Sequence, residues 1–270
     1  MSILPRTICI FGVITNVLLI TAFIKDPLKC FRNSGTYLVI NMAMSDLLTC
    51  FLANFSTWVP QKSYWILQFV WMTMTTVSIL TLGSISVDRF SIVVYPMKHR
   101  VLMRGKIVIM WSACIWLVAL AVSLINSIPS IRSTDHMEAT NFGGAAVIIL
   151  TGTMYGMTYC KLKKQSENLA LENLSNQQQQ ARLIKEKRFL KTIILVACIA
   201  ITCVVPALIF YYLTVLQDSP IGGVASRILT AIFAGIYYFN FAVNPLVYAL
   251  RLPNYRKTFY LLYCCKTTNR

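Results

Sequence analysis

Long apolar stretches that are almost free of charge recur along the chain, separated by short polar segments. A helix that crosses a bilayer needs roughly 20 mainly apolar residues, and seven stretches meet or nearly meet that length. The pattern predicts an all-α membrane protein in which a single domain, residues 1–270, forms a seven-transmembrane helix bundle. The predicted spans are residues 7–24, 36–58, 64–92, 107–131, 139–162, 186–216 and 227–250.

Two further segments lie outside these spans. Residues 253–264 predict a short amphipathic C-terminal helix, because Pro253 suits the first turn of a helix. Tyr, Phe and Leu alternate there with Arg256 and Lys257, which is typical of a helix lying along a membrane surface. The longest polar segment, residues 165–184, predicts a flexible loop with helical extensions at both ends. We interpret its run Gln177–Gln180 as a solvated linker.

The composition agrees with an integral membrane protein. Hydrophobic residues make up 57% of the chain and charged residues 13%, with a mean hydropathy of +0.63, whereas a soluble domain carries about a quarter charged residues. On one side of the predicted bundle the only basic residues are Arg6, Lys62, Arg132 and Arg227. The positive-inside rule puts that side and the N-terminus outside the cell, and the C-terminus in the cytoplasm.

The formal net charge of +16 then follows from topology and from attraction to anionic membrane lipid. We expect a multi-pass plasma-membrane protein with no nucleic-acid partner. The first span begins almost at Met1, so either the outer tail is minimal or the sequence is truncated there. A cleavable signal peptide is not expected, because the apolar run is too long and is followed by Lys25 rather than a cleavage site.

Two of the predicted spans contain an interior proline. Pro245 lies in the run Asn244-Pro245-Leu246-Val247-Tyr248, and Pro206 interrupts the span over residues 186–216. A proline removes one backbone hydrogen bond and bends the helix. In lipid such a break survives only where neighbouring helices or water satisfy the freed group. Both helices are therefore predicted to pack inside the bundle and to bend there.

A lone carboxylate, Asp46, lies in the middle of the second predicted span. Because a charge at membrane depth is costly, it is a functional candidate by default. Asn16, Ser78, Asn240 and Asn244 lie at matching depth in other spans. Carboxylate, hydroxyl and amide oxygens suit Na⁺ together with water, and a hydrogen-bonded structural network without an ion is the alternative.

A second charged group closes the third span, where Asp88 precedes Arg89. Glu186, at the start of the span over residues 186–216, is another possible partner of Arg89. A charge-assisted bond between the two spans would hold them together until they part, and Tyr155 lies where it can reach toward Arg89. The alternative is that Arg89 extends to the membrane surface. A bent helix held by a breakable ionic contact is typical of a switch.

The nine cysteines avoid the predicted outer loops, so no extracellular disulfide is expected. Cys264 and Cys265 follow the predicted C-terminal helix, a position that favours S-palmitoylation; two ordinary thiols are the alternative. Asn54 begins a glycosylation sequon near the outer end of the second span, and it lies close to the membrane.

With these residues in place, the chain resembles the rhodopsin-like (class A) G-protein-coupled receptors over essentially its whole length. Each motif is weak alone, but their order, depth and assignment to successive spans are specific. The motifs are Gly12–Val17, Asn41–Leu48, Ser84–Phe90 followed by Pro96, Trp116, Tyr155, Pro206 and Asn244–Tyr248.

The resemblance implies a receptor in which an agonist shifts a pre-existing equilibrium. The sixth span swings outward around Pro206, the contact between Arg89 and Glu186 opens, and Tyr155 and Tyr248 stabilise the active arrangement through water. A heterotrimeric G protein is the implied partner. Asp46, Ser78, Asn240 and Asn244 match the sodium site of the family, which favours the inactive state. No other cofactor is expected.

The outer half departs from the family pattern. Tyr64 stands where the family has a disulfide cysteine, and Val147 where it has a proline. Val204 replaces a tryptophan and Ala200 a phenylalanine, and the second span with its loop is about two turns short. The missing disulfide, the missing proline and a very short second outer loop resemble the melanocortin, cannabinoid and lysophospholipid receptors. This resemblance implies a ligand that is a lipid, a peptide or a neutral small molecule.

The same comparison disfavours two ligand classes, because Trp71 replaces the aspartate of amine receptors and Tyr238 the retinal lysine of opsins. The residues expected to line the ligand pocket are Trp71, Met72, Thr75, Val204 and Tyr238.

Two alternatives to a signalling receptor stay open. A seven-helix ion pump or channel would need a lysine in the last span and carboxylates in the third, which has none before Asp88. A non-signalling or chemosensory protein of the same fold is the other, since the sixth span is altered. An enzyme is not expected.

Overall fold

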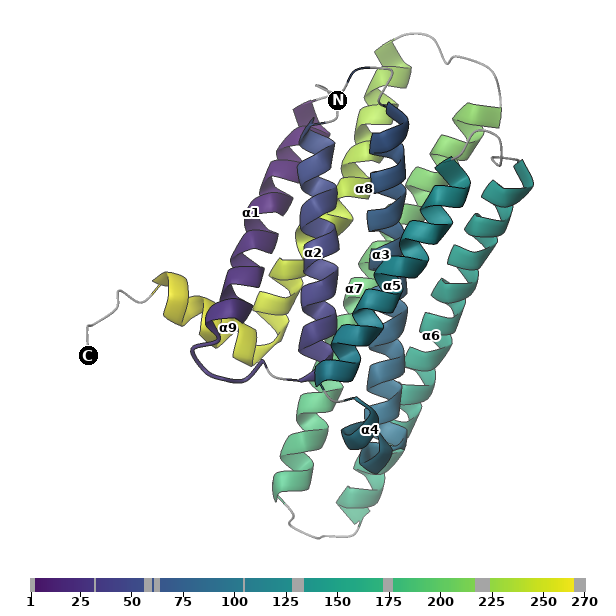
Figure 1. Cartoon of the computed structure of the whole chain (residues 1–270). Coiled ribbons are helices and arrows are strands. Elements are labelled where there is room, and N and C mark those ends of the chain that lie inside the picture. The colour runs from purple at the N-terminus through teal and green to yellow at the C-terminus, as the bar shows by residue number, and fades with distance from the viewer. Residues whose placement is uncertain are drawn as a thin grey trace.

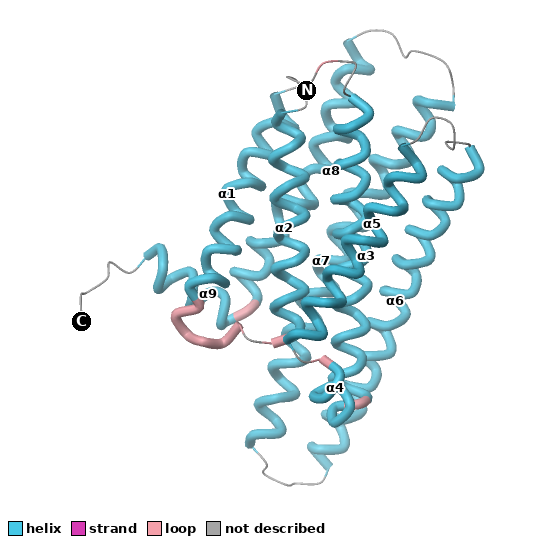
Figure 2. The backbone as a smooth tube through the Cα atoms, viewed as in Figure 1, coloured by secondary structure: helices cyan, strands magenta, loops and turns pink. Residues whose placement is uncertain are grey.

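The computed structural model describes residues 3–31, 33–55, 60, 64–103, 105–127, 134–171, 177–216 and 224–264. Within these ranges the chain is mostly helical and contains no strand, and the few described residues outside helices form short loops or turns (Figure 2). Long helices run side by side in one bundle (Figure 1). They are α1 (Ile3–Lys25), α2 (Ser34–Phe55), α3 (Tyr64–Val94), α5 (Gly105–Ser127), α6 (Thr134–Leu171), α7 (Gln177–Leu216) and α8 (Val224–Arg251).

Three shorter elements lie at one end of the bundle. Helix α4 (Pro96–Leu102) follows α3, while α9 (Pro253–Phe259) and the π-helical turn η3 (Tyr260–Cys264) follow α8. Prolines at the first turn of α4 and α9 suit these helix starts, because the N–H that proline lacks would have no partner there. The N-terminal end of α1 and the C-terminal elements lie at opposite ends of the bundle (Figure 1).

Six helices in the described part of the chain are long and apolar enough to cross a membrane. Helix α6 lies parallel to them but is not among the six. Glycine, threonine and tyrosine interrupt its apolar section, for example at Gly152, Thr153 and Tyr155, and this lowers its hydropathy. The helices with that character are Ile3–Lys25, Ser34–Phe55, Trp65–Val94, Gly105–Ser127, Leu183–Pro206 and Ile228–Arg251.

The polar segment between α6 and α7 is more helical than the sequence suggested. The run Gln177–Gln180, interpreted as a solvated linker, is the first turn of α7. Glutamine is a good helix former, and the run continues directly into the helix that carries Glu186. Together α6 and α7 therefore extend past the rest of the bundle (Figure 1).

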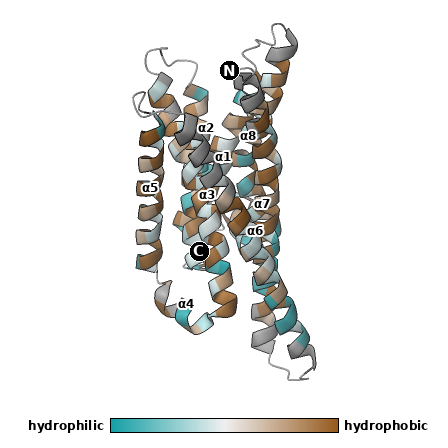
Figure 3. Cartoon of the chain, turned by 90° about the vertical axis from the view of Figure 1, so that its right-hand side faces the viewer, coloured by the Kyte–Doolittle hydropathy of each residue, from teal (hydrophilic) through white to brown (hydrophobic). Residues whose placement is uncertain are grey.

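Helix α3 is central, and it packs against α2, α5 and α6, while α8 packs against α1, α2 and α7. The main apolar core joins these helices in the half of the bundle that carries α4 and α9, with Leu38, Ile85, Ile193 and Tyr248 fully enclosed. Helix α5 exposes large apolar side chains, among them Leu117, and much of its ribbon is coloured as hydrophobic in Figure 3. In a bilayer this surface would face lipid, which is as apolar as the core.

Aromatic contacts attach the C-terminal elements to the bundle. Tyr255 of α9 meets Phe23 and Phe31 with ring centroids 5.4 and 4.8 Å away. Burial raises the pKa of the Tyr255 phenol well above its usual range, so the group stays neutral. Further on, the Tyr263 hydroxyl donates to the Leu18 carbonyl of α1 at 2.9 Å. Both ends of this C-terminal segment are thus fixed to α1 and its following loop.

Candidate functional site

The Asp46 carboxylate is fully buried where α2, α3 and α8 meet. Its Oδ2 accepts a hydrogen bond from Asn244 Nδ2 at 2.8 Å, and its Oδ1 accepts one from Ser78 Oγ at 3.3 Å. Three of the predicted residues are therefore brought together. A buried carboxylate with two neutral donors has the hydrogen bonds that make its burial tolerable.

Asn16, expected to lie beside Asp46, has its amide directed elsewhere. Its Nδ2 donates to the Phe241 carbonyl at 3.0 Å and to the Gly12 carbonyl at 2.9 Å. Phe241 lies four residues before Pro245, so its carbonyl is the one that loses a helix hydrogen bond to the proline. Helix α1 thus supplies the donor that the broken backbone of α8 lacks.

Three buried amide oxygens near this region have no hydrogen-bond donor among the described residues. They belong to Asn16, Asn240 and Asn244. Unsatisfied buried acceptors are costly and call for a water or a cation. Of these three amides, that of Asn244 is bonded to the Asp46 carboxylate. Carboxylate and amide oxygens are the ligands that a small hard cation requires.

Arg89 links α3 to α7 at the other end of the bundle. Its guanidinium contacts the Asp88 carboxylate, with Nε 2.9 Å from Oδ2, and its Nη1 donates to Glu186 Oε2 at 3.2 Å. The Phe189 ring covers it, with the ring centroid 4.3 Å from Cζ. Arg89 is only 6% exposed. The expected pairs with Asp88 and Glu186 are both present in the structure, and Arg89 does not extend to the surface.

Two neighbours of this ion pair were not singled out from the sequence. His99 Nε2 lies 2.8 Å from Asp88 Oδ1, and a β-carbon built on Gly35 would collide with the Arg89 guanidinium. The sequence analysis named Pro96, at the start of α4, only as part of a motif, and it did not indicate that the His99 ring turns back toward α3. Gly35, in the first turn of α2, leaves the space that the guanidinium occupies.

The two tyrosines expected to act near Arg89 have other partners in this structure. The Tyr155 hydroxyl lies 3.5 Å from the Leu82 carbonyl. The Tyr248 hydroxyl lies 3.8 Å from the Met42 sulfur. Both rings are buried. Tyr155 and Tyr248 belong to the same apolar core but have different hydrogen-bond partners. Their expected contact through water concerns the active arrangement.

The half of the bundle away from α4 and α9 holds an aromatic cluster around Tyr237, which we call the outer cluster. Thr75 Oγ1 and Tyr237 Oη are 2.9 Å apart, and the Trp71 and Tyr238 rings each lie 5.4 Å from the Tyr237 ring. Val204 packs on the same cluster. Trp71 Nε1 is buried without an acceptor among the described residues. Four of the five predicted pocket residues therefore lie in the cluster around Tyr237. Tyr237 itself was not among the residues predicted from the sequence.

Met72, the fifth predicted pocket residue, is half-buried on α3. Asn54, the predicted glycosylation site, lies in the last turns of α2 and donates to the Cys50 carbonyl at 3.0 Å.

The predicted lipidation sites differ in what the structure describes. Cys264 is an exposed thiol at the end of η3, and Cys265 lies outside the described residues. Cys30 is a different case, because burial raises the pKa of its thiol and disfavours the reactive thiolate.

Comparison with known proteins identifies the family of the chain. A model of the 7 transmembrane receptor (rhodopsin family) matches residues 15–142 and 136–248. The type-1 angiotensin II receptor A of Xenopus laevis is 25% identical, over 95% of this chain and 77% of its own length. The histamine H2 receptor of Homo sapiens is 24% identical, over 88% of this chain and 73% of its own length. The neuropeptide F receptor of Drosophila melanogaster is 26% identical, over 96% of this chain and 61% of its own length.

The family match runs through the helices that carry Asp46, Arg89, Pro206 and Asn244. It also implies a bundle of seven membrane helices, which makes α6 the seventh beside the six apolar ones. The chain therefore belongs to the rhodopsin family of seven-transmembrane receptors.

Proposed function

We propose that this receptor transmits an extracellular signal to a heterotrimeric G protein by parting α7 from α3. The observation that carries the proposal is the buried Arg89, which bonds to Asp88 within α3 and to Glu186 of α7. Such a contact stabilises the closed arrangement only while the two helices stay together. Opening it would create a crevice for the G protein at this end of the bundle.

The proposed orientation puts α4, α9 and the tip formed by α6 and α7 in the cytoplasm. Lysines and arginines concentrate at this end, including Lys98, Lys163 and Lys185, and the positive-inside rule assigns such an end to the cytoplasm. Pro206 lies inside α7, where the missing backbone bond makes a natural pivot. Tyr155 and Tyr248 would then stabilise the open form through water.

Nucleotide exchange tests the proposal most directly. The receptor in lipid nanodiscs is mixed with purified heterotrimeric G proteins of several subtypes, and binding of a non-hydrolysable GTP analogue is followed over time. We expect faster exchange than with empty nanodiscs for at least one subtype. If a correctly folded receptor accelerates none, with or without candidate ligands, the non-signalling alternative is the better description.

We further propose a neutral, lipid-like or peptide ligand that brings a hydrogen-bond acceptor to the outer cluster. The buried Trp71 Nε1 has no acceptor among the described residues, and the rings around it are uncharged. A panel of neutral lipids and peptides, screened with a promiscuous G protein, tests this. Activation by cationic amines alone would contradict it.

Glu186→Ala is expected to raise basal signalling about tenfold. A hydrogen bond to a charged group is worth about 1.5–3 kcal/mol, and this one favours only the closed arrangement. Ligand-independent nucleotide exchange at equal surface expression measures the effect. Glu167→Ala is the matched control, because Glu167 forms an exposed pair with Lys163. Equal basal activity in wild type and Glu186→Ala would rule out the ionic lock.

We also propose that Na⁺ binds beside Asp46 and favours the inactive state. Asp46 would provide the charge, and Ser78 and Asn244 lie within hydrogen-bond distance of its carboxylate. The amide oxygens of Asn16, Asn240 and Asn244 accept no hydrogen bond from the described residues, so a cation or water could satisfy them. A bound cation would also offset the cost of burying the carboxylate.

Asp46→Asn is expected to abolish stabilisation by sodium. In the wild type, the thermal unfolding midpoint should be higher in NaCl than in KCl of equal concentration, and the variant should show no difference. Asparagine keeps the size of the side chain and can still bond to Asn244 and Ser78, so the fold should survive. A wild-type midpoint that does not distinguish Na⁺ from K⁺ would mean that no specific ion site exists.

A further inference from the structure

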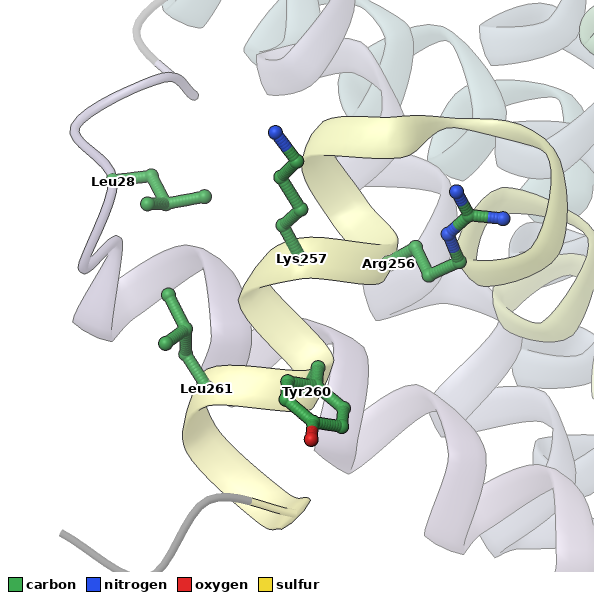
Figure 4. A pocket seen from close by; sticks show the side chains of 5 residues that line it. All are labelled: Leu28, Arg256, Lys257, Tyr260 and Leu261. Carbon is green, nitrogen blue, oxygen red and sulfur yellow. The ribbon is translucent and has the colours of Figure 1, made fainter.

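A cavity of about 380 Å³ opens between the loop after α1 and the C-terminal elements. Its lining residues are Leu28, Arg256, Lys257, Tyr260 and Leu261 (Figure 4). Leu28 is 40% exposed and Leu261 43% exposed. These two apolar side chains therefore leave a hydrophobic surface that water does not favour.

Basic residues lie next to this apolar surface. Arg256 and Lys257 are on α9; the Lys257 amine stands on the same side of the helix as Leu28, and the Arg256 guanidinium extends to the other side (Figure 4). Lys25 and Lys29 flank Leu28 in the sequence and are also exposed. Within the described residues, none of the four forms an ion pair. The Asp26 carboxylate nearby already accepts the backbone N–H groups of Cys30 and Phe31.

The position of the cavity relative to the bundle fixes its depth. The membrane-crossing helix α1 ends at Lys25, three residues before Leu28. The Tyr263 hydroxyl reaches back to the Leu18 carbonyl within α1, so the end of η3 lies beside the last turns of that helix. The cavity therefore lies where α1 leaves the apolar region, which is the level at which phospholipid headgroups join their acyl chains.

We propose that this cavity binds one anionic phospholipid of the cytoplasmic leaflet. An acyl chain packs against Leu28 and Leu261, while the headgroup phosphate and its additional negative charge meet Lys257 and Arg256. A soluble anion would leave the apolar cavity unfilled. A neutral lipid would leave the cationic residues beside the cavity without a partner. The leaflet rests on the proposed orientation, but lipid binding itself needs no G protein.

The test uses the full-length receptor in detergent, titrated with phosphatidylserine or with phosphatidylcholine of the same chain length. Native mass spectrometry counts the bound lipids. We expect one tight phosphatidylserine and at least tenfold weaker phosphatidylcholine. Arg256→Gln with Lys257→Gln should weaken phosphatidylserine binding by about tenfold or more. Lys161→Gln with Lys164→Gln removes the same charge from α6 and should change nothing.

Two further arms separate the possible occupants. Glycerophosphoserine, which has the headgroup but no chains, should compete poorly, and Leu28→Ser should weaken binding of the intact lipid several-fold. Equal affinity for the two phospholipids, full competition by the chain-free headgroup, or an equal loss in the α6 control would overturn the proposal. The proposal would also be overturned if phosphatidylserine bound only to the Cys264→Ser, Cys265→Ser variant. In that case an acyl group attached to one of these cysteines would be the occupant of the cavity in the wild type.

Discussion

Replacing Gly35 with alanine is expected to raise basal nucleotide exchange about tenfold or more. The new methyl group would overlap the Arg89 guanidinium and would lie 3.0 Å from its Cζ and 3.4 Å from Phe189 Cζ. The guanidinium is the end of a long side chain, so it can move away. Because the group is rigid, moving Nη2 off Asp88 would also shift Nη1 away from Glu186. Losing a charge-assisted contact of at least about 1.5 kcal/mol shifts the equilibrium roughly tenfold.

Gly35→Ala should act more strongly than Glu186→Ala because it displaces the arginine from both carboxylates. Its unfolding midpoint should stay near wild type, since alanine favours a helix more than glycine does. Gly152→Ala on α6 is the control, because a β-carbon there meets nothing within 4 Å. Basal exchange that matches the control at equal surface expression would show that Gly35 leaves the ionic contact undisturbed.

Gly12→Ala is expected to destabilise the receptor and lower its unfolding midpoint by several degrees. A β-carbon on Gly12 would lie 2.6 Å from Cys50 Sγ and 3.2 Å from Ala242 Cβ, so α1, α2 and α8 meet there without spare room. Overpacking of this kind costs about 1–3 kcal/mol, which exceeds the helix-propensity gain of up to about 1 kcal/mol. Moving α1 would also strain the Asn16 bond to Phe241.

A double variant makes this second prediction specific. Adding Cys50→Ala to Gly12→Ala removes the closest clash and should restore part of the lost midpoint. Gly156→Ala, where a new β-carbon meets nothing within 4 Å, should be neutral or slightly stabilising. The close approach of the three helices would be disproved if Gly12→Ala melted at the wild-type temperature.

The contacts that the sequence predicted well are those that charge makes obligatory. A carboxylate at membrane depth needs donors, and Asp46 finds two of them, Ser78 and Asn244, among the four candidates. Arg89 similarly meets both expected partners. Buried charges leave few choices, because an unpaired one would cost several kcal/mol.

Contacts that depend on the rotation of a helix about its axis were harder to predict. In a membrane protein both the lipid-facing and the core-facing sides are apolar, so hydropathy does not show which face is buried. The sequence therefore did not identify Tyr237 as the centre of the outer cluster. It also did not show that the Asn16 amide serves the Phe241 carbonyl, or that Gly35 makes room for Arg89. The ion, lipid and ligand sites stay predictions.

The length of α7 on one side of its proline gives a small bend a large mechanical effect. From Pro206 to Gln177 the helix is roughly 44 Å long at 1.5 Å per residue. A bend of about 10° at the proline would carry the far tip through roughly 8 Å, and Glu186 through roughly 5 Å. Residues next to the proline would hardly move. Val204 lies two residues from the proline, at the fulcrum of a lever arm. If the proposed parting of α7 from α3 is correct, a small shift of a side chain in the outer cluster would be enough to produce an opening as wide as a helix radius.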